Sequence, residues 1–194
     1  GPFAHRLASC GRPRSGVQLR ILDDEDRPVP AGERGEICIR GASVMKGYWE
    51  RPEATAQTLR GGWLHTGDVG TMDEYGYVYI LDRTKDMVIS GGLNIYPREV
   101  EEVLVTHPAV AEACVFGVPD ERWGEALKAH VVLVEGHDGV TEADIIAFAG
   151  EHLAAYKKPK SVDFVASLPK TAYGKLDKKA VRAPYWAGQD RMVR

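Results

Sequence analysis

The chain has 194 residues, a formal net charge of −3 and 44% hydrophobic residues. This length is enough for one large domain or two small ones. The slightly negative charge gives no indication of a nucleic-acid partner or an anionic membrane. No apolar run approaches the ~20 residues of a membrane span, so we expect a globular protein with no nucleic-acid partner and no transmembrane segment.

The three cysteines indicate the redox compartment. Cys10, Cys38 and Cys114 are odd in number, far apart and without the spacing of a metal site. We interpret them as reduced thiols of a cytoplasmic protein and expect no metal ligands in the chain. Cys38 and Cys114 lie in the alternating segments "EICIR" and "AEACVFGV", which predicts packed strand positions for both.

Residues 1–84 are rich in strand and turn signals. Residues 17–41 alternate between apolar and polar positions on both sides of "DDEDRPVPAGERG", which predicts a strand, a loop and a strand. Pro52 suits the first turn of a short helix that ends at Gly61–Gly62. The segments 62–70 and 71–83 predict two further strands around polar turns.

From about residue 86 the pattern changes to alternating helices and strands. Pro97 and the glutamates that follow it predict a helix over 96–108, and Thr141 with Asp144 predicts a capping box for a helix over 141–156. A last short helix begins after Asp177. Strands are predicted at 110–118, 126–134 and 161–166.

These patterns predict an α+β fold. The boundary between residues 1–84 and 85–194 falls inside the continuous segment "DRTKD", which contains no flexible linker. Two domains joined by so short a connection must pivot on one or two residues.

Two clusters near this boundary contain candidate binding residues. Asp68 follows Gly67 in "GWLHTGD", where its carboxylate suits a ribose diol or, equally, an Asx-type turn. Arg83 and Lys85 flank the boundary. Paired glycines in Ser90–Gly91–Gly92 let the backbone approach a ligand or reverse a hairpin, and the sequence leaves these alternatives open.

Basic residues gather near the C-terminus. Residues 155–182 contain eight Lys or Arg against two Asp, a local charge of +6. Lys157, Lys158 and Lys160 beside Tyr156 are typical of a stacked base with phosphates nearby, although a solvated basic surface fits as well. Lys170 or Lys175, in a loop that contains Thr171 and Gly174, could extend into a cleft where negative charge develops during a reaction.

In their order and spacing, these clusters resemble the adenylate-forming superfamily, which includes acyl-CoA synthetases, adenylation domains of peptide synthetases and beetle luciferases. The matching segments are "GERGEICIRGASVMKGYWERPEAT", "GWLHTGD", "GYVYILDRTKDMVISGGLNIYPREVE", "GVPDERWGE" and "PKTAYGK". Two earlier blocks of the family, the phosphate loop and the aromatic-Gly-x-Thr-Glu block, are not in this sequence. The resemblance implies that 1–84 is the β-rich terminal subdomain of an N-terminal AMP-binding domain and 85–194 the mobile C-terminal domain.

The resemblance also implies roles for individual residues. Asp68 would bind the ribose hydroxyls of ATP, and Arg83 the ribose and phosphate. Lys85 would be the hinge and Lys175 the lysine of adenylation. The loop Ser90–Gly91–Gly92 would line the pantetheine tunnel. The residues expected to meet the adenine and phosphates of CoA are Trp123, Tyr156, Lys158 and Lys160. Leu93 departs from many relatives, which have Glu, Phe or Tyr there.

The activity that the resemblance implies is that of an ATP-dependent, AMP-forming acyl-CoA synthetase acting on a fatty or aryl carboxylate. Its partners would be the carboxylic acid, ATP, coenzyme A and the missing N-terminal domain, with Mg²⁺ bound by a ligand outside this chain. The chain alone is expected to be inactive. The open alternatives are an adenylation domain of a peptide synthetase, a luciferase-like enzyme, and a non-catalytic CoA- or nucleotide-binding module.

Overall fold

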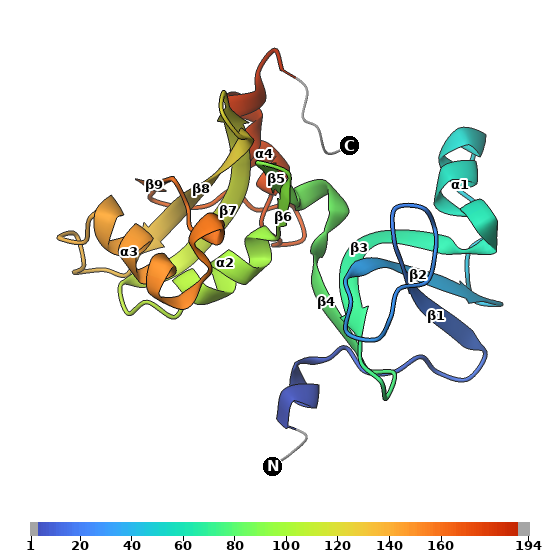
Figure 1. The fold of residues 1–194 in the computed structure, drawn as a ribbon. Helices are drawn as coiled ribbons and strands as arrows, with labels where there is room; N and C mark the ends of the chain where they lie inside the picture. Colours follow the sequence, from blue (N-terminus) through green and yellow to red (C-terminus); the bar gives the residue numbers. More distant parts are fainter. Residues whose placement is uncertain (1–3, 190–194) are drawn as a thin grey trace. The chain divides into compact units, whose positions relative to one another are not determined.

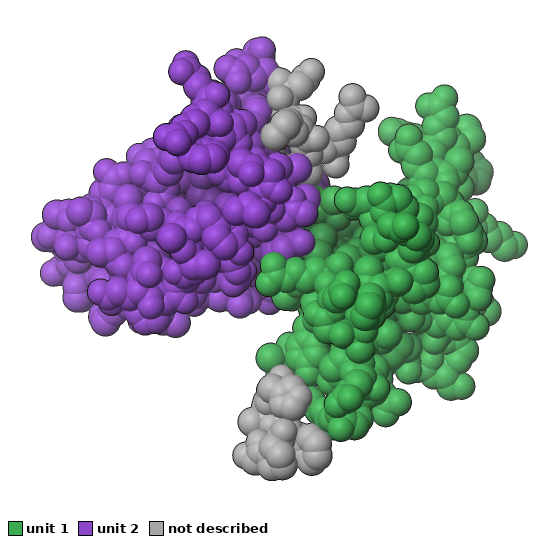
Figure 2. All heavy atoms as spheres, in the orientation of Figure 1, with its two compact units in different colours: residues 1–84 green, residues 85–194 purple. Residues whose placement is uncertain are grey.

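The computed structural model describes residues 4–189. The chain forms two compact units, residues 1–84 and residues 85–194, which are coloured separately in Figure 2. Each unit has its own sheet and its own hydrophobic clusters. Within the described residues, no helix combines the length and the apolar character needed to cross a membrane.

The first unit is a four-stranded antiparallel sheet in which strands adjacent in sequence pair in the order β1-β2-β3-β4 (Figure 1). Its strands are β1 Val17–Leu22, β2 Gly35–Gly41, β3 Leu64–Met72 and β4 Val78–Arg83. Its helices are η1 Ala4–Ala8, α1 Pro52–Thr58 and η2 Arg60–Gly62, and η3 Thr84–Asp86 follows at the boundary. The strands predicted around 17–41 and the helix beginning at Pro52 are confirmed.

Neighbouring residues of this sheet point to opposite faces, as expected of pleated strands. Ile21, Ile37 and Val78 form one buried cluster. Leu22, Cys38 and Trp63 form another. Because β1 and β2 each supply a buried residue to both clusters, the sheet has a small apolar layer on each face.

The second unit is a mixed sheet with helices on both faces. Four strands run in the order β6-β5-β8-β7, all neighbours being antiparallel, and β9 pairs with β8 in parallel. The strands are β5 Val88–Ser90, β6 Leu93–Ile95, β7 Val110–Asp120, β8 Gly124–Leu133 and β9 Ser161–Phe164. The helices are α2 Pro97–Leu104, α3 Glu142–His152, η4 Ala155–Lys157, α4 Lys178–Arg182 and η5 Ala183–Trp186.

Alternation along β7 explains how both faces of this sheet are covered. Val115 packs with Val100 of α2 and Ile145 of α3 in one buried cluster. Phe116 points the other way and packs with Val181 of α4. The unit therefore has three layers, with α2 and α3 on one face and α4 on the other (Figure 1). The predicted α+β fold is confirmed.

Local signals decide where the helices begin. Pro97 occupies the first turn of α2. Thr141 and Asp144 form the predicted capping box of α3, and the Asp177 side chain accepts a hydrogen bond from the Ala180 backbone N–H at the start of α4. Each such cap is worth about 1 kcal/mol. Helix α3 ends at His152, short of the predicted residue 156, because the chain turns extended at residue 153.

Candidate functional site

Asp68 and Arg83, which the sequence predicts at a ribose, lie opposite each other on β3 and β4. The Arg83 Nε atom is 3.2 Å from Asp68 Oδ1. The two side chains are 58% and 30% exposed, so both reach solvent. Gly67, with φ of +73°, turns the backbone just before the carboxylate. The Asp68 N–H donates to Thr66 Oγ1, while the Asp68 carboxylate pairs with Arg83.

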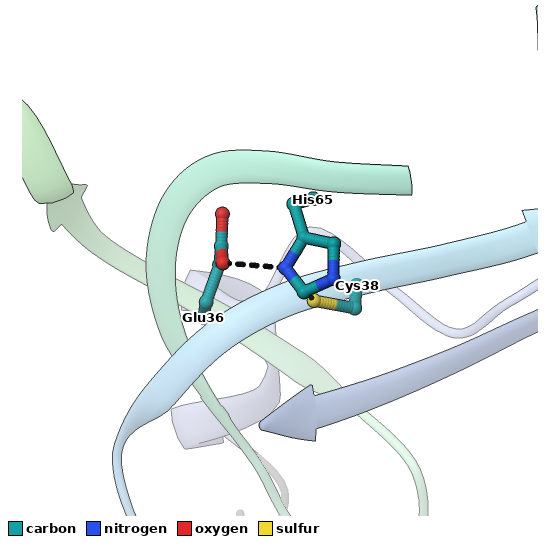
Figure 3. Close-up of side chains that lie close together, drawn as sticks. All are labelled: Glu36, Cys38 and His65. Atoms are coloured by element: carbon teal, nitrogen blue, oxygen red, sulfur yellow. Dashed lines mark hydrogen bonds and ion pairs between the residues drawn. The ribbon is translucent and has the colours of Figure 1, made fainter. Parts of the chain in front are cut away.

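A partly buried hydrogen-bond network supports the turn at Gly67, and Figure 3 shows its side chains. Glu36 on β2 accepts a hydrogen bond from the Gly67 backbone N–H at Oε1, over 2.8 Å. Its other oxygen lies 2.8 Å from His65 Nδ1. Cys38 Sγ lies 3.3 Å from the same nitrogen. The network explains why His65 is buried, and it supports a structural role for this histidine.

Glu36, Cys38 and His65 also have the ligand types of a metal site, with ligand atoms within 4.8 Å of one another. Two ligands of a tetrahedral zinc ion lie about 3.3 Å apart, whereas the contact between Glu36 and His65 has hydrogen-bond length. Burial raises the pKa of Cys38 to about 12, so the thiol is protonated when no cation lies beside it. The Arg60 guanidinium lies 3.4 Å from Glu36 and opposes a second cation. We therefore interpret the group as a hydrogen-bond network.

Lys175 lies in an exposed turn of the second unit. The Thr171 N–H donates to the Lys175 carbonyl over 2.7 Å, and the Gly174 N–H donates to the Thr171 carbonyl over 2.8 Å. Gly174 has φ of +76°, a conformation that favours glycine. Thr171 and Gly174 thus shape the loop as the sequence analysis expects, and they present the Lys175 side chain to solvent.

Lys85, the predicted hinge, is the first residue of the second unit and lies in η3. Its side chain is exposed. Its carbonyl accepts a hydrogen bond from Arg182 Nη1 over 3.2 Å. The backbone at this predicted hinge is therefore bonded to the end of α4, a contact that sequence analysis does not anticipate.

A pocket of about 500 Å³ in the second unit brings together most of the residues predicted to meet CoA. Its predicted members are Ser90, Gly91, Trp123, Tyr156, Lys158 and Lys160. Its apolar wall includes Leu93, Leu127, Ile146 and Pro159. Gly92 is not in the lining; it completes the turn between β5 and β6, where Gly91 and Gly92 have φ of +58° and +80°. The glycine pair therefore forms the hairpin turn that the sequence left open.

Trp123 is fixed against this hairpin. The Gly91 N–H donates to the Trp123 carbonyl over 2.9 Å, and a Cβ atom at Gly91 would lie 2.7 Å from the indole. The guanidinium of Arg122 lies 4.6 Å from the ring centroid. Asp120 accepts from the Trp123 N–H and from Lys160 Nζ, over 2.9 and 2.7 Å. These contacts, with that of Lys160 first, lower the pKa of Asp120.

Most of the basic residues between 155 and 182 are held in ion pairs. Lys157 is buried and bonded to Glu99 rather than facing the pocket, so the predicted cluster beside Tyr156 loses one cation. The pairs are Lys157–Glu99, Lys160–Asp120, Lys170–Glu112, Lys178–Glu101 and Arg182–Asp86. Across residues 4–189, no ion pair is recorded for Lys158 or Lys175. The same holds for Lys179, which lies exposed on α4, whereas Lys158 lines the pocket and Lys175 lies in the exposed turn.

Comparison with known proteins identifies the family. A model described as "AMP-binding enzyme" matches residues 2–49, and one described as "AMP-binding enzyme C-terminal domain" matches residues 99–175. The chain belongs to the AMP-binding enzymes. It is 49% identical to the medium/long-chain-fatty-acid–CoA ligase FadD8 of Mycobacterium tuberculosis, an alignment that covers 97% of this chain and 34% of FadD8.

Other AMP-binding proteins are similar over the same span. A feruloyl-CoA synthase from Amycolatopsis sp. is 50% identical over 92% of this chain and 36% of its own length. The crystal structure of ATP-bound MatB from Rhodopseudomonas palustris superimposes with a TM-score of 0.87, at 40% identity, covering 92% of this chain and 36% of MatB. The chain therefore spans about a third of the length of these AMP-binding relatives.

Three residues that sequence analysis does not single out help to build the candidate sites of this AMP-binding chain. Glu36 supports the turn before Asp68, Asp120 joins Trp123 to Lys160, and Arg182 bonds the predicted hinge residue. For Asp120 the sequence does contain a signal, because an aspartate often accepts the N–H two residues on, as Asp120 does from Arg122. For Glu36 and Arg182 no local signal exists, because their partners lie 31 and 97 residues away.

Proposed function

We propose that this chain is the C-terminal part of an ATP-dependent, AMP-forming acyl-CoA synthetase that acts on a fatty or aryl carboxylate. Residues 1–84 complete its N-terminal AMP-binding domain, and residues 85–194 form its mobile C-terminal domain. The acyl pocket and the phosphate loop lie outside this chain. The names of FadD8 and the feruloyl-CoA synthase favour this acyl range.

One observation carries the proposal: on an exposed turn the second unit presents Lys175, for which no ion pair is recorded among residues 4–189, and separately it contains a pocket with aromatic and cationic walls. Two separate features suit two half-reactions. The ammonium of Lys175 meets charge that develops at an α-phosphate. Trp123 and Tyr156 suit adenine stacking, and the Lys158 ammonium suits a phosphate.

The reaction has two steps. In the first, a carboxylate oxygen attacks the α-phosphorus of ATP, the bond to the bridging oxygen breaks, and pyrophosphate leaves. In the second, the sulfur of CoA attacks the acyl carbon, the bond from that carbon to the AMP oxygen breaks, and the thiol proton passes to solvent. Asp68 and Arg83 hold the ribose in both. Rotation about Lys85 withdraws Lys175 and brings the Ser90–Gly91–Gly92 turn to the thiol.

Mg²⁺ belongs to the first step, where it neutralises phosphate charge. Magnesium prefers oxygen ligands, and the metal-type group found among the described residues contains a thiol and an imidazole. We therefore assign the Mg²⁺ ligand to the N-terminal region outside this chain. We assign the enzyme to the cytoplasm, an assignment supported by three cysteines that form no disulfide.

ATP–pyrophosphate exchange tests the proposal. We expect carboxylate-dependent exchange and CoA thioester formation from an enzyme that includes the N-terminal region, and no exchange from residues 1–194 alone. An N-terminally completed enzyme that binds CoA but activates no carboxylate would instead be a binding module. Robust exchange by residues 1–194 would contradict the assignment of essential groups to the missing region.

A further inference from the structure

We propose that Arg182 is a positioning residue for adenylation, because it ties the backbone of the hinge to the helix that follows the Lys175 turn. The inference rests on the proposed function, since it concerns how Lys175 is delivered to the α-phosphate. All of its contacts lie within residues 85–194.

One nitrogen of Arg182 binds two consecutive residues at the hinge. Arg182 Nη1 donates to the Lys85 carbonyl over 3.2 Å and to Asp86 Oδ1 over 3.0 Å. The side chains of Arg182 and Asp86 are only 16% and 13% exposed. An ion pair with this little solvent contact is screened less than a surface pair. The end of α4 and the start of the second unit are therefore joined by a specific, partly buried link.

The other end of the same helix supports the Lys175 turn. The Asp177 N–H donates to the Pro169 carbonyl over 2.9 Å, which closes the loop that contains Lys175. Asp177 also caps α4. Lys178, the first residue of the helix, pairs with Glu101 of α2 over 2.8 Å. Helix α4 is thus anchored at both ends, near Lys175 at one and at the hinge at the other.

This arrangement makes the hinge segment, α4 and the Lys175 turn parts of one rigid body. When the domain of residues 85–194 rotates about Lys85, any relative motion between Lys85 and α4 displaces the Lys175 ammonium. A misplacement of about 1 Å can cost on the order of 10² in rate. Arg182 contacts no substrate in this scheme, and its effect passes through Lys175.

The test begins with R182Q in the enzyme that includes the N-terminal region. We expect R182Q to lower the rate of acyl-AMP formation about 10-fold with little change in the KM for ATP, and R182K to lose less. The matched control is R98Q, because Arg98 also pairs with a carboxylate, Glu102, but is 53% exposed on α2. We expect the control to change the rate less than about 2-fold.

A double-mutant cycle separates positioning from a general structural effect. If Arg182 acts through Lys175, R182Q should cost nothing further in the K175A enzyme. Two outcomes would overturn the inference and leave the proposed function standing, provided that the wild-type enzyme is active. In one, R182Q lowers the rate of acyl-AMP formation by the same factor in the wild-type and K175A backgrounds. In the other, R182Q changes the rate in neither background.

Amide hydrogen exchange on residues 1–194 tests the link without catalysis. R182Q should speed exchange at the Thr171 and Asp177 amides, both of which donate within the Lys175 loop, while the β7–β8 ladder keeps its protection. Unchanged exchange at both amides would overturn the link. A wild-type enzyme that forms no acyl-AMP would overturn the proposed function and the positioning role together, whatever the exchange result.

Discussion

Arg83 and Asp68 face each other across the β3–β4 ladder, with Arg83 Nε 3.2 Å from Asp68 Oδ1. The pairing orients the carboxylate, and within residues 4–189 no hydrogen bond or ion pair is recorded for its second oxygen. It also means that two residues proposed to contact one ribose are prearranged within a single sheet, before any ligand binds.

The D68N variant should therefore weaken ATP binding in the enzyme that includes the N-terminal region. Hydrogen bonds to a charged group contribute about 1.5–3 kcal/mol, so we expect the KM for ATP to rise about 10- to 100-fold. D24N is the control, because Asp24 lies exposed in the β1–β2 loop. Steady-state kinetics with varied ATP measure the effect. Equal KM values for D68N and D24N would refute the ribose assignment.

Replacement of Lys175 should separate the two half-reactions. K175A removes a donor that faces developing charge, so acyl-AMP formation should fall by about 10²–10³. Thioester formation from supplied acyl-AMP should persist, because the proposed hinge rotation has by then withdrawn the lysine. K179A is the comparison, since Lys179 is also exposed and lies four residues further along the chain, in α4. Equal losses in both half-reactions of K175A would argue against domain alternation.

A proline at the hinge should impair the second half-reaction more than the first. K85P fixes φ and removes the backbone N–H, but it keeps the carbonyl that Arg182 binds. K85A removes the same side chain without restricting φ. The difference between K85P and K85A therefore isolates the backbone effect. Single-turnover measurements of the two steps provide the comparison. A K85P enzyme that transfers acyl groups to CoA at the K85A rate would eliminate Lys85 as the pivot.

Local patterns predict the elements of this fold well, because their determinants lie within a few residues. The capping box at Thr141 and Asp144, the cap at Asp177 and the alternation through Cys114 all have the predicted structure. The end of α3 is less predictable. The sequence of residues 153–156 is compatible with a helix. The extended backbone of Leu153 accompanies the packing of its side chain against the core cluster of the second unit.

Charge pairing cannot be predicted in the same way. The sequence indicates a local excess of +6 between residues 155 and 182, but not which ammonium groups are already neutralised. Lys157 meets Glu99 and Lys160 meets Asp120, at separations of 58 and 40 residues. Only the folded chain distinguishes these lysines from Lys158. The sequence therefore predicts the residues of the candidate CoA site, but not which of its lysines is available to a phosphate.

This difference yields a prediction for the two lysines of the pocket. Lys158 has no recorded ion pair among the described residues, whereas Lys160 Nζ lies 2.7 Å from Asp120 Oδ2. K158A should raise the KM for CoA about 10-fold, and K160A should raise it less. Neither effect should appear with a short acyl-acceptor thiol that lacks the nucleotide. A larger effect of K160A than of K158A would show that the ligand displaces Asp120.

His130 should make the stability of the chain depend on pH. Its Nε2 lies 2.9 Å from Tyr185 Oη and 3.5 Å from Asp163 Oδ2, and its ring packs edge-on against Phe116. Burial lowers the pKa of His130 below 6.5, with a smaller contribution from Lys128, while Asp163 opposes the shift. The unfolded chain therefore binds this proton more readily than the folded chain.

The stabilisation from neutral His130 is fully present above pH 6.5 and is lost as the pH falls through the lower pKa of the folded state. We expect the free energy of unfolding, measured with urea, to decrease from pH 7.5 to pH 5.5, and H130Q to reduce this decrease. H137Q should leave it unchanged, because His137 is exposed in a turn. If H130Q and the wild type lose equal free energy of unfolding between these pH values, the partly buried His130 imidazole is not the group responsible.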